Sequence, residues 1–273
     1  SMTPGTDGDG SPFIGVDNLA NYFVAMNHAM GSDIYHYDES GTMVPDLDEG
    51  IIEKLFLNYY EPFTKGYYGA KGRYRSDDVK QSYLAGCIGS SSSVLYFPEE
   101  VADSQGNMVP VTTGVYQYPV MEGTTPTAIQ QGAGVAVFNR SDEENRAALD
   151  FIRWLTIDKG FELAASMSYM PVDHNGMTEE QKQQIDDARV LNGIETGLKQ
   201  SNSYQMVYGF DFENSYDVRT GVDACFGEAL SQGRMEFEEY LARGMSMDEA
   251  AASMDYGSKA EAFYEQVKAI FEE

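Results

Sequence analysis

Apolar residues recur at helical spacing through residues 215–273, and this pattern constrains the fold more than any other feature of the sequence. One helix is predicted to begin at Asp217, with these apolar residues on a single face: Val218, Val222, Cys225, Phe226 and Ala229. A second helix is predicted after Ser246, which forms a capping box with Glu249. Its apolar positions are Met254, Phe263, Val267 and Ile270. Two strong amphipathic helices are therefore expected at the C-terminal end of the chain.

Further helices are predicted nearer the N-terminus and in the middle of the chain. Residues 18–30 carry apolar side chains at helical spacing, and Asp48 can cap a second helix. Ser141 and Glu144 form a capping box before a third helix. This third helix is expected to bury Ala148, Phe151, Ile152 and Leu155, with Trp154 beside them in the core.

The strands are predicted mainly between these helices. Segments 94–97 and 132–138 are short apolar runs typical of buried strands, and residues 34–44 indicate a hairpin. Because few strands lie between helix-rich ends, the fold class is predicted to be α/β.

The chain is strongly acidic, with 18 Lys and Arg against 44 Asp and Glu and a net charge of −26. A surface of this charge repels phosphate backbones and anionic lipids, so neither nucleic acid nor an anionic membrane is an expected partner. No apolar run approaches the ~18 residues that a membrane span requires. The charge by itself indicates a well-solvated surface rather than a fold.

The sequence carries no recognisable catalytic motif. None of the three histidines, His28, His36 and His174, lies at a spacing that would chelate a metal with a neighbouring Cys or His. Nucleophile elbows, phosphate-binding loops and CxxC pairs are missing from the sequence. Cys87 and Cys225 have apolar neighbours and are predicted to be buried free thiols. We therefore expect a protein that is not an enzyme and has no metal and no cofactor.

Four segments, in this order, resemble the C-terminal half of the family 1 extracellular solute-binding proteins: 11–44, 82–94, 127–172 and 215–233. That family includes the maltodextrin and glycerol-3-phosphate binders. The third segment is the most specific, because it has a Gly-rich strand, a capped helix reading AALDFIRWL, a second helix and then Tyr-Met-Pro. In the second segment, the stretch between Gly86 and Gly89 is shorter than in the family and lacks its usual Ala-Met.

The resemblance implies a periplasmic-binding-protein type II-like fold, present as the C-terminal lobe with an incomplete part of the N-terminal lobe. By this resemblance, residues 12–128 and 201–273 form the C-terminal lobe, and residues 129–200 are the piece that normally completes the N-terminal lobe. Residues 1–11, rich in Gly, Asp, Ser and Pro, are expected to be a flexible linker or the remnant of a trimmed tag.

The same resemblance implies a non-catalytic subunit of an ABC importer that binds a sugar or polyol. Such a subunit docks onto permease subunits and is extracytoplasmic, either as a cell-surface lipoprotein or in the periplasm. We expect a monomer whose two lobes close on the solute about a hinge. With the rest of the N-terminal lobe missing, the chain alone is expected to bind solute weakly or not at all.

In this family aromatic faces, loop backbone and hydroxyl groups hold the solute between the lobes. The positions that match such contacts are Phe13, Ser90, Ser91, Gly132, Tyr169, Tyr216 and Arg219. Structural alternatives exist for four of these sites: Phe13 as core, the serine run as a solvated loop, Gly132 as a packing glycine and Tyr169 as a turn staple. Because the stacking tryptophans of the maltodextrin binders become Ser91 and Ser215 here, a small or more polar solute is favoured.

Arg219 is predicted to lie in the first turn of its helix, where the helix dipole disfavours a cation by roughly 0.3–1 kcal/mol. A carboxylate of the chain, such as Asp217 or Glu213, would offset that cost. A ligand anion or a cluster of ligand hydroxyls is the other possibility, since an arginine offers a two-pronged set of donors.

A function of a different class is also open. The chain would then be an interaction or sensory module on the same fold, with its cleft used for docking another protein. Thermal shifts of the full-length protein against a panel of sugars and polyols would separate the two. A hydrolase, a third class, would need two carboxylates facing each other in one pocket.

Overall fold

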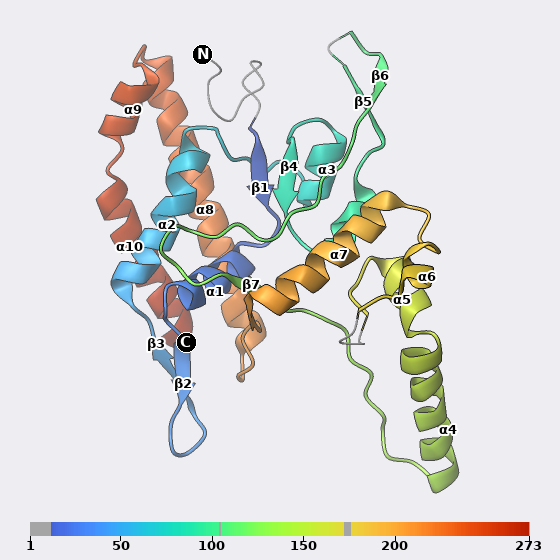
Figure 1. Ribbon diagram of the computed structural model, residues 1–273. Helices are drawn as coiled ribbons and strands as arrows, with labels where there is room; N and C mark the ends of the chain where they lie inside the picture. The colour runs from blue at the N-terminus through green and yellow to red at the C-terminus, as the bar shows by residue number, and fades with distance from the viewer. Residues whose placement is uncertain (1–11, 104, 172–175, 273) are drawn as a thin grey trace. The chain divides into compact units, whose positions relative to one another are not determined.

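The computed structural model describes residues 12–103, 105–171 and 176–272 (Figure 1). By their internal contacts, the described residues divide into two compact units. Unit 1 contains residues 12–89, 120–130 and 205–272, and unit 2 contains residues 90–119 and 131–204. The chain therefore passes from one unit to the other after residues 89, 119, 130 and 204. The predicted linker at 1–11 lies outside the described residues.

The fold is mixed α/β, with long helices and four two-stranded sheets among the described residues. The elements of unit 1 are β1 (Ile14–Val16), α1 (Leu19–Ala29), β2 (Ile34–Tyr37), β3 (Met43–Asp46), α2 (Glu49–Thr64), α3 (Arg75–Lys80), β4 (Gly86–Ile88), β7 (Thr127–Ile129), β8 (Gln205–Val207), α8 (Ser215–Ala242), α9 (Met247–Ser253) and α10 (Tyr256–Glu272). Pairs β1–β4 and β7–β8 are parallel, and β2–β3 is the predicted antiparallel hairpin.

The core of unit 1 lies where α2, α8 and α10 pack together. The ring of Phe56 stacks on Phe263 with centroids 4.3 Å apart, and Phe263 meets Phe226 at 4.5 Å. All three rings are fully buried, which gives each helix an anchor of large apolar area. Most of the apolar positions predicted for the C-terminal helices are therefore confirmed as core, while Ala229 and Ile270 are only partly buried. The single helix predicted after Ser246 is wrong, because α9 ends at Ser253, with Met254 as its cap, and the chain continues as a separate helix, α10.

Helix α8 begins two residues earlier than predicted, at Ser215, because Asn214 adopts a left-handed conformation and ends the preceding turn. The capping box of Ser246 and Glu249 is present at the start of α9, as predicted. Asp48 caps α2 by accepting a hydrogen bond from the Ile51 backbone N–H.

The elements of unit 2 are the 3₁₀ helix η1 (Ser91–Tyr96), β5 (Glu100–Ala102), β6 (Met108–Pro110), α4 (Asp142–Arg153), the π-helical turn η2 (Trp154–Asp158), α5 (Gly160–Met167), α6 (Glu179–Lys182) and α7 (Ala188–Ser203). Strands β5 and β6 pair antiparallel. The core is small and forms around α7, where Val190 and Ile194 pack with Val94 and Met177. The resemblance placed residues 90–119 in the C-terminal lobe, whereas this packing places them with α7 in unit 2.

Both buried strands predicted in the middle of the chain are wrong. Segment 94–97 lies in and just after η1, because Ser90 caps that helix and Val94 packs against α7. Segment 132–138 has no strand partner among the described residues and is extended and exposed, with 81% of Phe138 accessible to solvent. A short apolar run becomes a strand only where a neighbouring strand accepts its hydrogen bonds.

Helix α4 has the predicted capping box of Ser141 and Glu144, but its predicted burial is wrong. No residue of α4 is buried among the described residues, and Phe151 is 55% exposed. Trp154, predicted to be core, is exposed and packs on Phe151 with centroids 5.8 Å apart. The other residues of this face, Ala148, Ile152 and Leu155, are only partly buried, and segment 135–138 lines a shallow hollow together with Ala148, Phe151 and Ile152.

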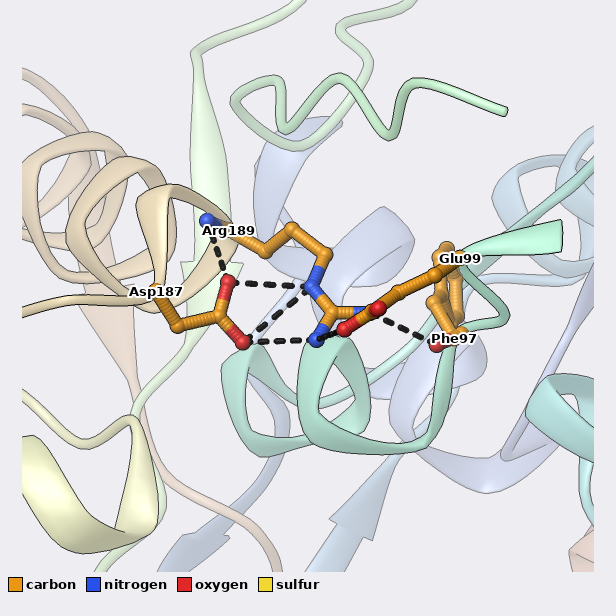
Figure 2. A network of polar contacts seen from close by, with 4 residues as sticks. All are labelled: Phe97, Glu99, Asp187 and Arg189. Atoms are coloured by element: carbon orange, nitrogen blue, oxygen red, sulfur yellow. Dashed lines mark hydrogen bonds and ion pairs between the residues drawn. The ribbon is translucent and has the colours of Figure 1, made fainter. Parts of the chain in front are cut away.

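An arginine joins the start of α7 to the chain after η1 (Figure 2). Arg189 Nη2 lies 2.6 Å from the Asp187 carboxylate and 2.9 Å from that of Glu99, and its Nη1 donates to the Phe97 carbonyl at 2.9 Å. Asp187 also caps α7 by accepting from the Arg189 backbone N–H. The proximity of the guanidinium lowers the pKa of Asp187. This network holds segment 97–99 against α7 by polar contacts where apolar packing is limited.

Candidate functional site

The carboxyl ends of β1 and β4 form one edge in unit 1, because the two strands are parallel and Val16 pairs with Ile88. Ligands in α/β proteins commonly bind beyond the carboxyl ends of parallel strands. The side chains gathered there are Asp17, Asn18, Asn21, Arg219 and Asp223, and we call this group the carboxyl edge. Asp17 and Asn18 follow β1 directly, Asn21 lies in the first turn of α1, and the last two residues lie on α8.

The amino terminus of α1 is already satisfied by the protein itself. Asp223 Oδ1 accepts hydrogen bonds from the backbone N–H groups of Leu19 at 2.9 Å and Ala20 at 3.3 Å. Asn18 caps the same helix by accepting from Asn21 N at 2.7 Å. A carboxylate at this position is stabilised by the helix dipole. The free N–H groups that would attract a ligand anion are thus occupied by Asp223 and Asn18.

Arg219 lies beside this helix start and donates from Nη2 to Asn21 Oδ1 at 3.2 Å. Neither Asp217 nor Glu213, the carboxylates considered from the sequence, forms an ion pair with it, and no other described residue does so. Because α8 begins at Ser215, Arg219 is its fifth residue and lies beyond the first turn, where the dipole effect fades. Its partly buried charge therefore meets a neutral amide and retains unused donors.

Tyr216 and Arg219 are brought together, since positions i and i+3 share one side of a helix. The Tyr216 side chain is 76% exposed, so its ring is open to solvent beside the arginine. Both residues belong to unit 1.

Phe13 is not brought to the carboxyl edge. It precedes β1, so it lies about 13 Å along the chain from Asp17 at the strand rise of ~3.3 Å per residue. Its backbone is fixed by bonds to Tyr67 and Ala85, while its ring is 58% exposed. The alternative in which Phe13 is a core residue is therefore wrong.

Two of the predicted positions in unit 2 are brought together. Ser91 Oγ donates to the backbone carbonyl of Ser168 at 3.0 Å, and Tyr169 follows directly. Ser90 is used as the cap of η1 and accepts from Ser92 N. Gly132 lies apart from them in the exposed segment, with open space where a side chain would be, so it is not a packing glycine.

Ser168 was not anticipated from the sequence. It ends α5 in a left-handed conformation with φ of 52°, is fully buried, and its Oγ has no hydrogen-bond partner among the described residues. A buried hydroxyl without a partner is costly and commonly marks a strained or functional position. No sequence signal identifies it, because a serine at the end of a helix is unremarkable until its partners are known.

The structure describes both thiols of the chain as unpaired. Cys87 and Cys225 are free, as predicted, and only Cys225 is buried while Cys87 is partly buried. Burial raises the pKa of Cys87 to about 12 and that of Cys225 to about 11, so both are protonated thiols at neutral pH.

In the described residues, no group of three or more His, Cys, Asp or Glu side chains is arranged to hold a metal ion. None of the helices described combines the length and apolar character needed to span a bilayer.

The chain has no match among protein-family models, curated proteins or solved structures.

Proposed function

We propose that the chain is a non-catalytic solute-binding subunit of an ABC importer, with a sugar or a polyol as its solute. The observation that carries the proposal is Arg219 at the carboxyl edge. Among the residues that the structure describes, this partly buried arginine donates only to the neutral amide of Asn21, and the exposed Tyr216 ring lies on the same side of α8. An arginine guanidinium can donate hydrogen bonds to the hydroxyls of a sugar, and a tyrosine ring can stack on its C–H face.

The path of the chain supports the proposal. It leaves unit 1 after residue 89 and again after residue 130, and returns after residues 119 and 204. In the family that the sequence resembles, the chain also crosses between the lobes more than once, and the lobes close on the solute about a hinge. The proposal includes a periplasmic-binding-protein type II-like fold with an incomplete N-terminal lobe, an extracytoplasmic location, a monomeric state and docking onto permease subunits.

Calorimetric titration of the complete gene product with a panel of sugars and polyols tests the proposal. At least one member should bind with a dissociation constant below about 1 mM. Arg219→Ala should weaken that binding by at least about tenfold, because a hydrogen bond from a charged donor is lost. Arg243→Ala, at an exposed ion pair near the end of the same helix, is the matched control and should change nothing. Failure of every panel member to bind would refute the proposal.

An interaction or sensory module is the second candidate, and the apolar face of α4 favours it. Leu149, Phe151 and Ile157 are all exposed on this face and the turn that follows it. Exposed apolar patches of this kind are typical of protein-binding surfaces. If the panel gives no binding and Phe151→Ser abolishes association of the complete gene product with a partner protein, this second function replaces the first.

A further inference from the structure

A pocket of about 360 Å³ lies within unit 1, and neither a carboxyl-edge residue nor a predicted site residue lines it. One wall is a stripe of α8 that includes Gly227, Ser231 and Arg234. Aromatic rings form much of the facing wall, among them Tyr59 and Tyr68, whose centroids are 5.1 Å apart. The volume is that of a small-molecule site, and the lining mixes apolar side chains with polar ones.

Gly227 points to a use for this space. Helix α8 contains three glycines, and two are explained by close packing: a Cβ at Gly221 would lie 2.9 Å from Ile270, and one at Gly233 would overlap the Tyr60 hydroxyl. At Gly227 a Cβ would meet no described atom within 4 Å. A glycine in the middle of a helix weakens that helix. Since packing does not require Gly227, what it preserves is the open volume of the pocket.

Arg234 provides the polar end of the pocket. Its Nε donates to Glu238 Oε1 at 2.7 Å and its Nη1 to the Thr64 carbonyl at 3.0 Å, so the guanidinium is held in one orientation. No described residue accepts a hydrogen bond from Nη2, and the side chain is 34% exposed. Because Glu238 already balances the charge, and the chain carries a net charge of −26, an uncharged acceptor suits Nη2 better than an anion.

We infer that this pocket binds an uncharged, largely apolar ring compound that carries a hydrogen-bond acceptor. The ring packs between the tyrosine wall and Gly227, and the acceptor receives a hydrogen bond from Arg234 Nη2. The rings of Tyr59 and Tyr68 favour an aromatic ring, which can pack against them. This inference is independent of the proposed function, because the two sites share no residue.

Fluorine NMR titration of the protein with p-fluorobenzamide tests the inference, since this probe has the ring and the carbonyl acceptor. Saturable binding at about millimolar concentration is expected for a probe of this size. Absence of saturable binding would overturn the inference. So would tighter binding of methyl glucoside in a competition titration, because that result would assign a different ligand class.

Variants then locate the probe. Gly227→Leu fills the pocket and should weaken p-fluorobenzamide binding at least about tenfold. Gly257→Leu adds the same side chain to α10 outside the pocket and should leave binding unchanged. Ser231→Leu also fills the pocket, and its effect on p-fluorobenzamide binding replaces that of Gly227→Leu if Gly227→Leu does not fold. Unchanged binding in the folded filling variants would place the probe elsewhere and overturn the assignment.

Arg234→Gln separates a ligand contact from a structural role. It should weaken p-fluorobenzamide about tenfold and leave p-fluorotoluene, which lacks the acceptor, unaffected. Equal loss of both probes would show that Arg234 only shapes the pocket and would overturn its role as a donor.

Discussion

Helices α8 and α4 both carry the apolar spacing of amphipathic helices, yet they have opposite surroundings. In unit 1 the apolar face of α8 is buried against α2 and α10, and Phe226 is fully inaccessible. In unit 2 no residue of the apolar face of α4 is fully buried and Phe151 is 55% exposed, although the capping box of the helix is complete. The comparison teaches that spacing and capping specify a helix and its apolar side, whereas burial depends on whether another element has a complementary face.

The largest expected difference between the two helices is the cost of removing one aromatic ring. Phe226→Ala should lower the free energy of unfolding by about 3–5 kcal/mol, because it opens a cavity between Phe56 and Phe263. Phe151→Ala in α4 is the matched change and should cost less than about 1 kcal/mol. Urea unfolding followed by circular dichroism measures both values. A large loss from Phe151→Ala would mean that α4 is covered after all and would break the comparison.

A smaller effect is expected from the polar network of unit 2. Arg189→Ala should destabilise unit 2 by about 2 kcal/mol, because it leaves the Phe97 carbonyl and the Asp187 carboxylate without their shared donor. Arg146→Ala, at an exposed position of α4, is the control and should stay within about 0.5 kcal/mol. Hydrogen exchange of the α7 amides measures the loss in this unit.

The same network predicts how unit 2 responds to acid. The pKa of Asp187 is lowered below its ordinary value by Arg189, so the pair stabilises the fold at pH values above the ordinary aspartate pKa of about 4. This contribution is lost as the pH falls below that value toward the folded-state pKa. In the Arg189→Ala variant the corresponding decrease in α7 protection below about pH 4 should be smaller.

The smallest expected effect concerns His28 in α1 of unit 1. Burial lowers the pKa of His28, and Asp33, whose carboxylate lies 3.4 Å away, opposes that shift only in part. The unfolded chain therefore binds this proton more readily, and unit 1 should lose some stability as the pH falls through about 6.5. His28→Gln should remove this step from the pH dependence of α1 hydrogen exchange. An unchanged step would assign it to another group.

Much of the helical structure could be predicted because its signals are local. The caps at Ser141 and Ser246 depend on residues three positions apart, and the hairpin of β2 and β3 on a turn of adjacent residues. The apolar faces of α1, α2, α8 and α10 were recognised for the same reason and are buried. The parallel pairs could not be predicted, since β7 and β8 are separated by most of unit 2 and the sequence does not state which strands meet.

The candidate site shows the same limit. From the sequence, Arg219 had either a nearby carboxylate or a ligand as its partner, but its partner in the structure is Asn21, which is 198 positions away. The role of Gly227 could not be predicted, because the sequence does not distinguish a glycine that packs closely against its neighbours from one that faces open space. Ser168 was missed because its burial depends on η1 and α7.

By itself, the sequence determined the caps at Asp48, Ser141 and Ser246, which sides of the helices are apolar, and that the chain is highly acidic. Hydrogen bonds and side-chain spacing within a few residues set these properties, so they do not depend on the fold of the rest of the chain. Only the tertiary structure decided that α8 is buried while α4 is exposed, that segment 132–138 forms no strand, and that Arg219 faces an amide. Each of these depends on contacts between residues far apart in the chain, which local patterns do not encode.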